Sequence, residues 1–319
     1  MDEKKLELFI KTLKRQRYGV VGKHSAVKIC EWTKKSIKDE GVCYKEKFYG
    51  SLYGIRSHTC LQMSPAAFFC PNRCVYCWRA TEHTIAAEMS DENWDLGIDE
   101  PEDIINGCII EHRRLLSGLK GFEGTNMKKW EESQNPRNAA ISLIGEPTAY
   151  PKIGELVKAF NDKGFTTFLV TNGMFPERLE KMFENGINPT QLYLSLDAPT
   201  KEMYKKIDRP TLPDFWERLN KTIELLGDYK GKKCIRLTMV KGWNTEAWDK
   251  YAELIKRANA DFVEVKAYMF LGFSRRRLKE ENMPHYQEIV EYASMLNDYL
   301  GYKWGGEDER SRVVLLKKR

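Results

Sequence analysis

Short apolar runs alternate with amphipathic stretches along this chain from residue 139 to residue 268. Each run is rich in strand-forming residues and is followed by a Gly, Asn or Pro break and then by a helical pattern. The five runs are AAISLIG (139–145), FTTFLV (165–170), TQLYLSLD (190–197), CIRLTMV (234–240) and DFVEVKAYM (261–269). Their nearly continuous apolar character predicts strands covered on both faces, in a parallel sheet with right-handed crossovers.

A sixth unit of the same kind precedes these five. LQMSPAAFFC (61–70) predicts a first strand despite Pro65, and DIINGCIIEHRRLLSGL predicts a helix with Pro101 at its start. Six βα units indicate an α/β fold, either a partial (β/α)6 TIM-like barrel or a curved open sheet, with the chemistry at the C-terminal strand ends.

Two ends of the chain fall outside this repeat. We expect residues 61–271 to form the core, residues 1–60 an N-terminal extension and residues 272–319 a C-terminal extension. The first extension begins with a basic helix pattern and then lacks clean periodicity, which predicts loops. The second predicts a helix from Pro284 and a final strand in RVVLLKKR.

Composition agrees with a globular protein that has a large core. The 319 residues are 42% hydrophobic and 31% charged. The charged N-terminus lacks the apolar region of a signal peptide, and no stretch reaches the roughly 18 apolar residues of a membrane helix. We therefore expect a cytoplasmic protein without a membrane partner. The 52 basic and 46 acidic residues give a net charge of +6, which is compatible with a polyanionic partner.

Three of the eight cysteines lie close together in the sequence CPNRCVYC. Cys70, Cys74 and Cys77 follow the first predicted strand with the spacing C-x3-C-x2-C. Three cysteines ligate three irons of a 4Fe–4S cluster and leave the fourth iron open to an exogenous ligand, which suggests catalysis. The alternative is a structural zinc site, which needs a fourth ligand from Cys60 or His58.

The spacing, with an aromatic residue before the last cysteine, resembles the radical S-adenosylmethionine (SAM) superfamily, in which SAM chelates the open iron. The later strand ends agree with this resemblance. Gly145-Glu146-Pro147 resembles the superfamily's GGEP motif, with Ile144 in place of the first glycine. The candidate SAM contacts are Gly145, Glu146, Pro147, Thr171, Asn172, Ser195, Asp197 and Met239.

A second set of cysteines precedes the first set. Cys30, Cys43 and Cys60 are separated by 43 − 30 = 13 and 60 − 43 = 17 residues, which is too wide for a zinc knuckle. They either hold a second 4Fe–4S cluster with an open iron or pack as buried apolar residues, and the sequence alone favours neither. We assign the two remaining cysteines, Cys108 and Cys234, to packing.

Longer stretches make the resemblance specific. KICEW, CYKEKFYG, YGIRSHTCLQMSP, CPNRCVYCWR, ISLIGEPTAYP, VEVKAYMFLGFSRRRL and SRVVLL resemble the archaeal-type tRNA 4-demethylwyosine synthase family, the radical SAM enzymes of wybutosine biosynthesis. The resemblance covers nearly the whole chain and implies two 4Fe–4S clusters and SAM. One departure is FYGSLYG, a short duplication that predicts a lengthened loop.

The resemblance also implies a reaction. In this family N1-methylguanosine at position 37 of phenylalanine tRNA is converted with pyruvate into 4-demethylwyosine, after a SAM-derived radical abstracts hydrogen from the methyl group. Lys45 is the candidate Schiff-base anchor for pyruvate and Lys47 the second candidate; alternatively pyruvate chelates the auxiliary cluster.

The resemblance also implies that the protein contacts tRNA phosphates and receives electrons from a donor. Arg275, Arg276 and Arg277 are candidate phosphate contacts, as are the basic residues of the first helix and of the C-terminus. We expect a monomer with a separate flavodoxin- or ferredoxin-like electron donor. The alternatives are another radical SAM enzyme with an auxiliary cluster, or a zinc-stabilised RNA-binding protein without catalysis.

Overall fold

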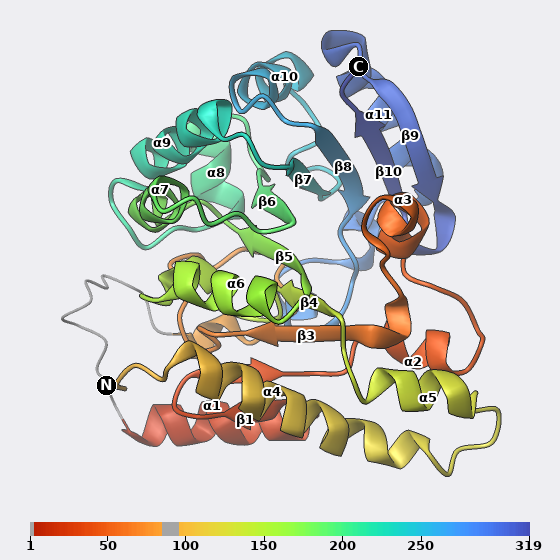
Figure 1. Ribbon diagram of the computed structural model, residues 1–319. Coiled ribbons are helices and arrows are strands. Elements are labelled where there is room, and N and C mark those ends of the chain that lie inside the picture. The colour runs from red at the N-terminus through yellow and green to blue at the C-terminus, as the bar shows by residue number, and fades with distance from the viewer. Residues whose placement is uncertain (1–2, 85–95) are drawn as a thin grey trace. The chain divides into compact units, whose positions relative to one another are not determined.

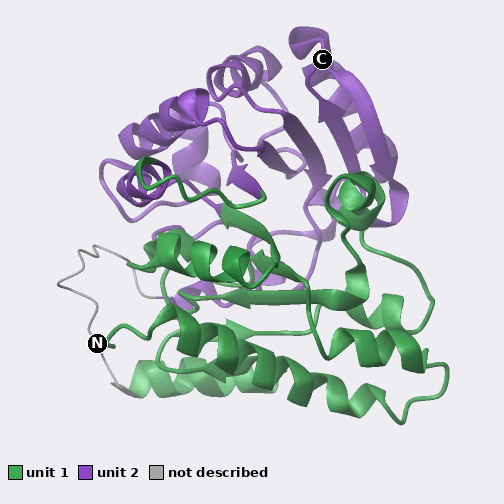
Figure 2. Ribbon diagram, viewed as in Figure 1, with its two compact units in different colours: residues 1–69, 88–170, 184–190 green, residues 70–87, 171–183, 191–319 purple. Residues whose placement is uncertain are grey.

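The computed structural model describes residues 3–84 and 96–319 (Figure 1). By its contacts the chain divides into two compact units (Figure 2). Unit 1 takes in residues 1–69, 88–170 and 184–190, and unit 2 takes in residues 70–87, 171–183 and 191–319. The domain boundaries predicted after residues 60 and 271 divide the chain differently and stay predictions.

Unit 1 contains a mixed sheet with helices packed on it (Figure 1). Strands β3, β4 and β5 are parallel, and an antiparallel β1–β2 pair extends the sheet beyond β3. Helix α4 packs on β1, β2 and β3 and on α6. The elements are α1 (Glu3–Arg15), β1 (Gly19–Val21), β2 (Ser25–Val27), α2 (Glu31–Ile37), α3 (Tyr44–Tyr53), β3 (Cys60–Ser64), α4 (Pro101–Leu116), α5 (Met127–Ser133), β4 (Asn138–Ile141), α6 (Ile153–Asp162) and β5 (Thr166–Thr171).

Unit 2 continues the βα alternation and ends in an antiparallel hairpin. Strands β6, β7 and β8 are parallel, β10 pairs antiparallel with β8, and β9 pairs antiparallel with β10. Helix α11 packs on α10, β8 and β10. The elements are α7 (Pro176–Glu184), β6 (Gln191–Ser195), α8 (Lys201–Ile207), α9 (Phe215–Asp228), β7 (Lys233–Met239), α10 (Trp248–Arg257), β8 (Phe262–Ala267), α11 (Tyr286–Leu300), β9 (Lys303–Asp308) and β10 (Val313–Lys317).

The predicted α/β fold is confirmed, with the six predicted strands observed as β3 to β8. Their cores are fully buried, as in the run from Gln191 to Leu194, which explains why no polar face interrupts the apolar runs. The first strand is shorter than predicted. It ends at Ser64 because Pro65 carries no N–H for the ladder, so residues 65–70 are not part of it.

The loops predicted for the N-terminal extension were wrong. Residues 19–53 contain two strands and two helices. The strands have three residues each, too short for alternation to be visible. The FYGSLYG segment belongs to α3 rather than to a lengthened loop, and the helix ends where Gly54 adopts the left-handed conformation (φ 67°). The strand β9 was also not predicted.

Within the described part of the chain, none of the helices is both long and apolar enough to cross a membrane.

Candidate active site

The segment that carries the first three cysteines, residues 70–77, has no regular structure and is held by its backbone. The N–H of Val75 donates to the carbonyl of Ile207 (2.8 Å), and the N–H of Arg73 donates to the carbonyl of Asp208 (2.9 Å). The carbonyl of Pro71 accepts from the N–H of Thr211 (2.8 Å). This segment, hereafter the cysteine loop, is therefore anchored on the end of α8 and the residues that follow it.

Two buried carboxyl groups lie directly beside the cysteine loop. The thiol of Cys74 donates to Asp208 Oδ1 (3.1 Å), and the hydroxyl of Tyr76 donates to Asp197 Oδ2 (2.5 Å). Asp197 also accepts from the N–H of Thr238 (2.7 Å). Burial, and then the charge of Asp197, hold the pKa of Asp208 well above its ordinary value.

These surroundings fit a cluster that supplies positive charge. Burial, followed by the charge of Asp208, raises the pKa of the Cys74 thiol well above its ordinary value, and the charges of Cys70 and Cys77 raise it further. Asp208 Oδ2 is buried and has no hydrogen-bond partner among the described residues. Bound iron stabilises thiolates against this cost. The three thiols are thus a donor set that fits a metal cluster, and the two carboxyl groups lie beside them.

The side chains around the cysteine loop do not form a site for a single metal ion among the described residues. Across residues 3–84 and 96–319, no three His, Cys, Asp or Glu side chains converge closely enough to hold one metal ion. In a 4Fe–4S cluster each thiolate binds a different iron, so its ligands are spaced more widely.

Several predicted SAM contacts of unit 2 lie near the cysteine loop. Asn172 Nδ2 is 4.0 Å from Cys70 Sγ, and Asp197 bonds to Tyr76 as described. Thr171 and Asn172 accept from the N–H groups of Gly173 and Met174 and so shape the turn after β5.

The two remaining candidates of unit 2 end their strands. Ser195 is partly buried at the end of β6, and Met239 is fully buried at the end of β7. Met239 therefore packs in the protein interior, and its predicted contact with adenine stays a prediction.

The GEP motif follows β4 in unit 1 and is tightly constrained. Gly145 has φ 70°, and a Cβ atom at this position would lie 1.9 Å from the carbonyl oxygen of Ala66. The Glu146 carboxylate accepts from the N–H (3.0 Å) and the hydroxyl (2.6 Å) of Thr148, next to Pro147 in a 3-10 turn. Glu146 thus has a structural role in this turn beside its predicted contact with the ammonium of SAM.

The second set of cysteines is brought together in unit 1. Cys30 and Cys43 are the N-cap residues of α2 and α3, and Cys60 is the first residue of β3. Burial raises the pKa of Cys60, and the charges of Cys30 and Cys43 raise it further, whereas the charge of Lys45 opposes this shift. Cys60 lies at the N-terminal end of its strand, so the predicted location at C-terminal strand ends does not apply to this set.

A polar network supports these cysteines. Ser57 Oγ accepts from the N–H of Cys43 (2.8 Å) and donates to Glu46 (2.5 Å). His58, the residue weighed as a zinc ligand, instead bonds to Glu132 (2.7 Å), which lowers the pKa of that carboxyl group.

The two candidate lysines differ in their surroundings. Lys45 lies in the first turn of α3, is partly buried, and has its Nζ 4.7 Å from the ring centre of Phe168. Its charge acts on both Cys30 and Cys60. Lys47 is exposed. The structure therefore places Lys45, and not Lys47, in the half-buried environment of the cysteines.

The three arginines predicted to contact phosphates differ in their exposure. Arg275 and Arg276 are exposed, whereas the side chain of Arg277 is only 12% exposed. Arg277 donates to the carbonyl of Val75 (3.1 Å), to the carbonyl of Cys77 and to Glu82 (2.8 Å).

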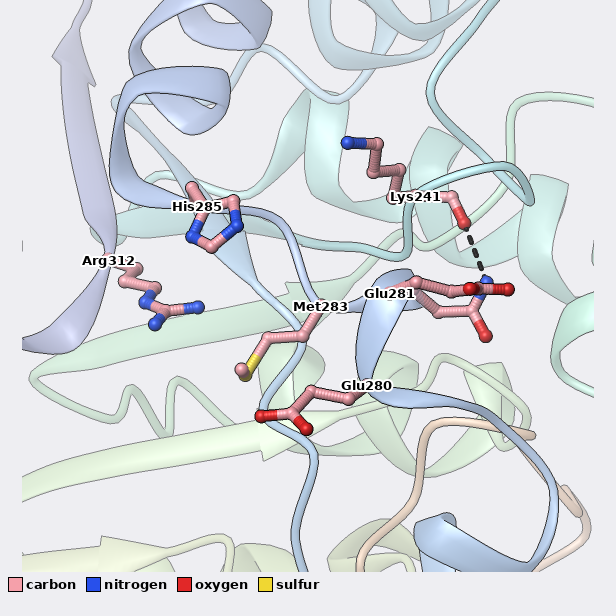
Figure 3. Close-up of a pocket in the computed structure, with 7 residues that line it drawn as sticks. Lys241, Glu280, Glu281, Met283, His285 and Arg312 are labelled. Atoms are coloured by element: carbon pink, nitrogen blue, oxygen red, sulfur yellow. Dashed lines mark hydrogen bonds between the residues drawn. The ribbon is translucent and has the colours of Figure 1, made fainter.

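One pocket of about 670 Å³ in unit 2 is lined by residues 241, 280–283, 285 and 312 (Figure 3). Its charges are mixed. Lys241 Nζ pairs with Glu288 (2.5 Å), Arg312 donates to the carbonyl of Pro284 (2.9 Å), and Glu280 and Glu281 add negative charge. This pocket is therefore not the basic groove that phosphate binding would favour.

Sequence reasoning missed Asp208 and Ser57. Asp208 follows α8 in a segment without a recognisable motif, and Ser57 lies between two predicted cysteine ligands without a periodic pattern. Their roles depend on contacts across 134 and 14 residues of chain, respectively.

Two family profiles match the chain. One, described as the radical SAM superfamily, matches residues 126–255, and the other, described as wyosine base formation, matches residues 257–318. The chain is 46% identical over 319 residues to a SAM-dependent tRNA 4-demethylwyosine synthase of Pyrococcus horikoshii, which covers 100% of this chain and 90% of that protein. A Methanocaldococcus jannaschii protein of the same name is 39% identical over 315 residues, which are 98% of this chain and 96% of that protein.

Solved structures are similar as well. A structure of TYW1 with a lysine–pyruvate adduct bound has a TM-score of 0.85 at 38% identity and covers 98% of this chain and 96% of that chain. A crystal structure of archaeal TYW1 has a TM-score of 0.77 at 34% identity, with the same coverage.

Together, the α/β fold, the anchored cysteine loop and these matches define a radical SAM protein. Membership of this class implies SAM and a 4Fe–4S cluster as cofactors. More narrowly, the chain belongs to the family of SAM-dependent tRNA 4-demethylwyosine synthases.

We expect Gly145→Ala to destabilise unit 1 more than Gly164→Ala. Both glycines have positive φ, so both substitutions carry about 1 kcal/mol of backbone strain, but only position 145 adds a clash with backbone oxygens. A Cβ atom at Gly164 meets nothing within 4 Å. Urea unfolding of the two variants measures the difference, and equal losses of stability would contradict the constraint described for Gly145.

Proposed function

We propose that this protein converts N1-methylguanosine at position 37 of phenylalanine tRNA and pyruvate into 4-demethylwyosine, as a carbon–carbon lyase. The observation that carries the proposal is Lys45, a partly buried amine whose charge acts on two cysteines of a second set. A similar solved structure is described as holding a lysine–pyruvate adduct, and Lys45 offers this chemistry here.

In the first site, we assign Cys70, Cys74 and Cys77 as ligands of the 4Fe–4S cluster. When bound, the cluster and SAM supply the radical chemistry. The protein's own residues hold the reactants: the cysteine loop is fixed by its backbone, and Asn172 and Asp197 lie beside it. Orienting reactants and excluding water is the larger part of what such a protein contributes.

In the second site, we assign Cys30, Cys43 and Cys60 to a second 4Fe–4S cluster. Two features support this assignment. Cys30 and Cys43 both cap helices, where backbone N–H groups favour a thiolate, and the charge of Lys45 favours the thiolates of Cys30 and Cys60.

Lys45 would anchor pyruvate as a Schiff base. The neutral Nζ attacks the 2-keto carbon, a carbon–nitrogen double bond forms, and the keto oxygen leaves as water. Nζ lies 4.7 Å from the ring centre of Phe168, a contact that stabilises the charged amine. The amine must therefore lose a proton before it attacks pyruvate.

The remaining partners are proposed on the surface of the chain. Arg275 and Arg276 are exposed side chains suited to phosphates of tRNA. A separate flavodoxin- or ferredoxin-like protein would donate the electrons to a monomeric enzyme.

The reaction itself is tested with product analysis. We expect the anaerobically reduced protein, mixed with SAM, pyruvate and N1-methylguanosine-containing tRNA, to form the tricyclic nucleoside, detected by mass spectrometry. Omitting pyruvate should abolish it. Formation of 5′-deoxyadenosine without the tricyclic product would show that the proposed substrates are wrong.

The two lysines give a matched comparison for the pyruvate anchor. With 13C-pyruvate and cyanoborohydride, wild type and Lys47→Ala should trap one reduced pyruvate on residue 45, located by peptide mapping, and Lys45→Ala should trap none there. Product formation by Lys45→Ala should fall roughly 100-fold or more because pyruvate is no longer held in place. Full product formation by Lys45→Ala would exclude Lys45 as the anchor.

Iron analysis tests the second cluster. The reconstituted wild type should contain about eight iron and eight sulfide per chain, and a variant with Cys30, Cys43 and Cys60 all changed to Ala should contain about four of each. Cys108→Ala is the control, because Cys108 is fully buried in α4. About four iron in the wild type would refute two clusters.

A further inference from the structure

Arg277 differs from its basic neighbours in what its guanidinium group contacts. Arg275 and Arg276 are exposed and lie over the rings of Phe270 (5.0 Å) and Phe273 (4.5 Å). Arg277 is the residue after the 3-10 turn Gly272–Arg276 and points inward. Its Nε and one terminal nitrogen donate to two carbonyl groups of the protein, and the other terminal nitrogen pairs with Glu82.

The two carbonyl groups belong to the cysteine loop. They are those of Val75, next to Cys74, and of Cys77 itself. A guanidinium group presents its donors in a fixed plane, so two contacts to one short segment fix the orientation of both peptide groups. A lysine at this position keeps the charge but not this fork.

The turn that carries Arg277 is itself pressed against the same segment. The N–H of Phe273 donates to the carbonyl of Trp78 (3.0 Å). Gly272 has φ 54°, and a Cβ atom there would lie 2.3 Å from the same oxygen. The carbonyl groups of Val75, Cys77 and Trp78 are therefore all covered from the segment 272–277.

The backbone bonds from residues 207–211 hold the first part of the cysteine loop but not its end. The backbone bonds to Ile207, Asp208 and Thr211 reach residues 71, 73 and 75 of the loop, and none of these three bonds reaches Cys77. The N–H of Cys77 donates within the loop to the carbonyl of Cys74 (3.2 Å), and the carbonyl of Cys77 accepts from Arg277. Because the loop has no strand or helix ladder, the contacts from segment 272–277 add the attachment of this end of the loop to the rest of unit 2.

We propose that Arg277 is a positioning residue that holds Cys77 in place for the 4Fe–4S cluster, rather than a contact to tRNA phosphates. This role rests on the proposed ligation of that cluster by Cys70, Cys74 and Cys77. It divides the basic triplet by function, with Arg275 and Arg276 directed to the tRNA and Arg277 directed to the cluster.

The test compares Arg275→Gln, Arg276→Gln and Arg277→Gln in the full reconstituted chain, because each variant loses one charge. The readouts are the electron paramagnetic resonance signal that responds to SAM, bound iron, and tRNA affinity. We expect Arg277→Gln to lower the SAM-responsive signal per chain roughly threefold or more, and bound iron from about eight toward about four. The other two variants should keep both and bind tRNA more weakly.

A conservative variant guards against misfolding. Arg277→Lys keeps the charge, and circular dichroism should show that it folds; it should nevertheless lose the SAM-responsive signal, and amides 75–78 should exchange faster with deuterium. If Arg277→Lys keeps the wild-type signal, the positioning role is wrong. If Arg277→Gln binds tRNA more weakly while its cluster signal is intact, Arg277 is a phosphate contact.

The outcome is separable from the proposed reaction, because none of these readouts requires the tricyclic product. A wild-type chain whose reduced cluster does not respond to SAM would overturn the ligand assignment, and this role with it.

Discussion

Gathering thiols and carboxyl groups away from water is the physical constraint on which unit 2 depends. Burial raises the pKa values of Cys74, Asp197 and Asp208, so their charged forms are disfavoured when nothing positive is bound. Hydrogen bonds from Tyr76 and from the N–H of Thr238 offset part of this cost for Asp197. The positive core of a 4Fe–4S cluster would offset this cost for the thiolates of Cys70, Cys74 and Cys77, which we propose as its ligands.

The same constraint explains how the cysteine loop is attached. A segment without a strand or helix of its own has few local bonds to fix its conformation; here they include those from the N–H of Cys77 to the carbonyl of Cys74 and from Arg73 to the carbonyl of Cys70. The loop is also held by backbone bonds to residues 207–211 and by the guanidinium group of Arg277. Rigid elements thus position the loop that carries the proposed cluster ligands, an arrangement common in α/β proteins.

The cysteines of unit 1 are surrounded by different groups. Two cysteines of its set are helix N-caps with nearly equal backbone angles, φ −63° and ψ 146° for Cys30 and φ −64° and ψ 144° for Cys43. Helix N-termini and the charge of Lys45 favour negative sulfur there. Glu46 acts on this set through Ser57, and the charge of Glu31 acts on Cys30.

The sequence by itself determined the six βα units, the close spacing of the first set of cysteines and the family. Burial of whole strands leaves an apolar run, and Cys70, Cys74 and Cys77 stay close because they lie within eight residues. Only the tertiary structure decided that Cys30, Cys43 and Cys60 share one environment, that Lys45 rather than Lys47 joins them, and that Arg277 contacts the cysteine loop 202 residues away. Such contacts depend on how the chain folds back on itself, and periodicity or spacing along the chain carries no record of them.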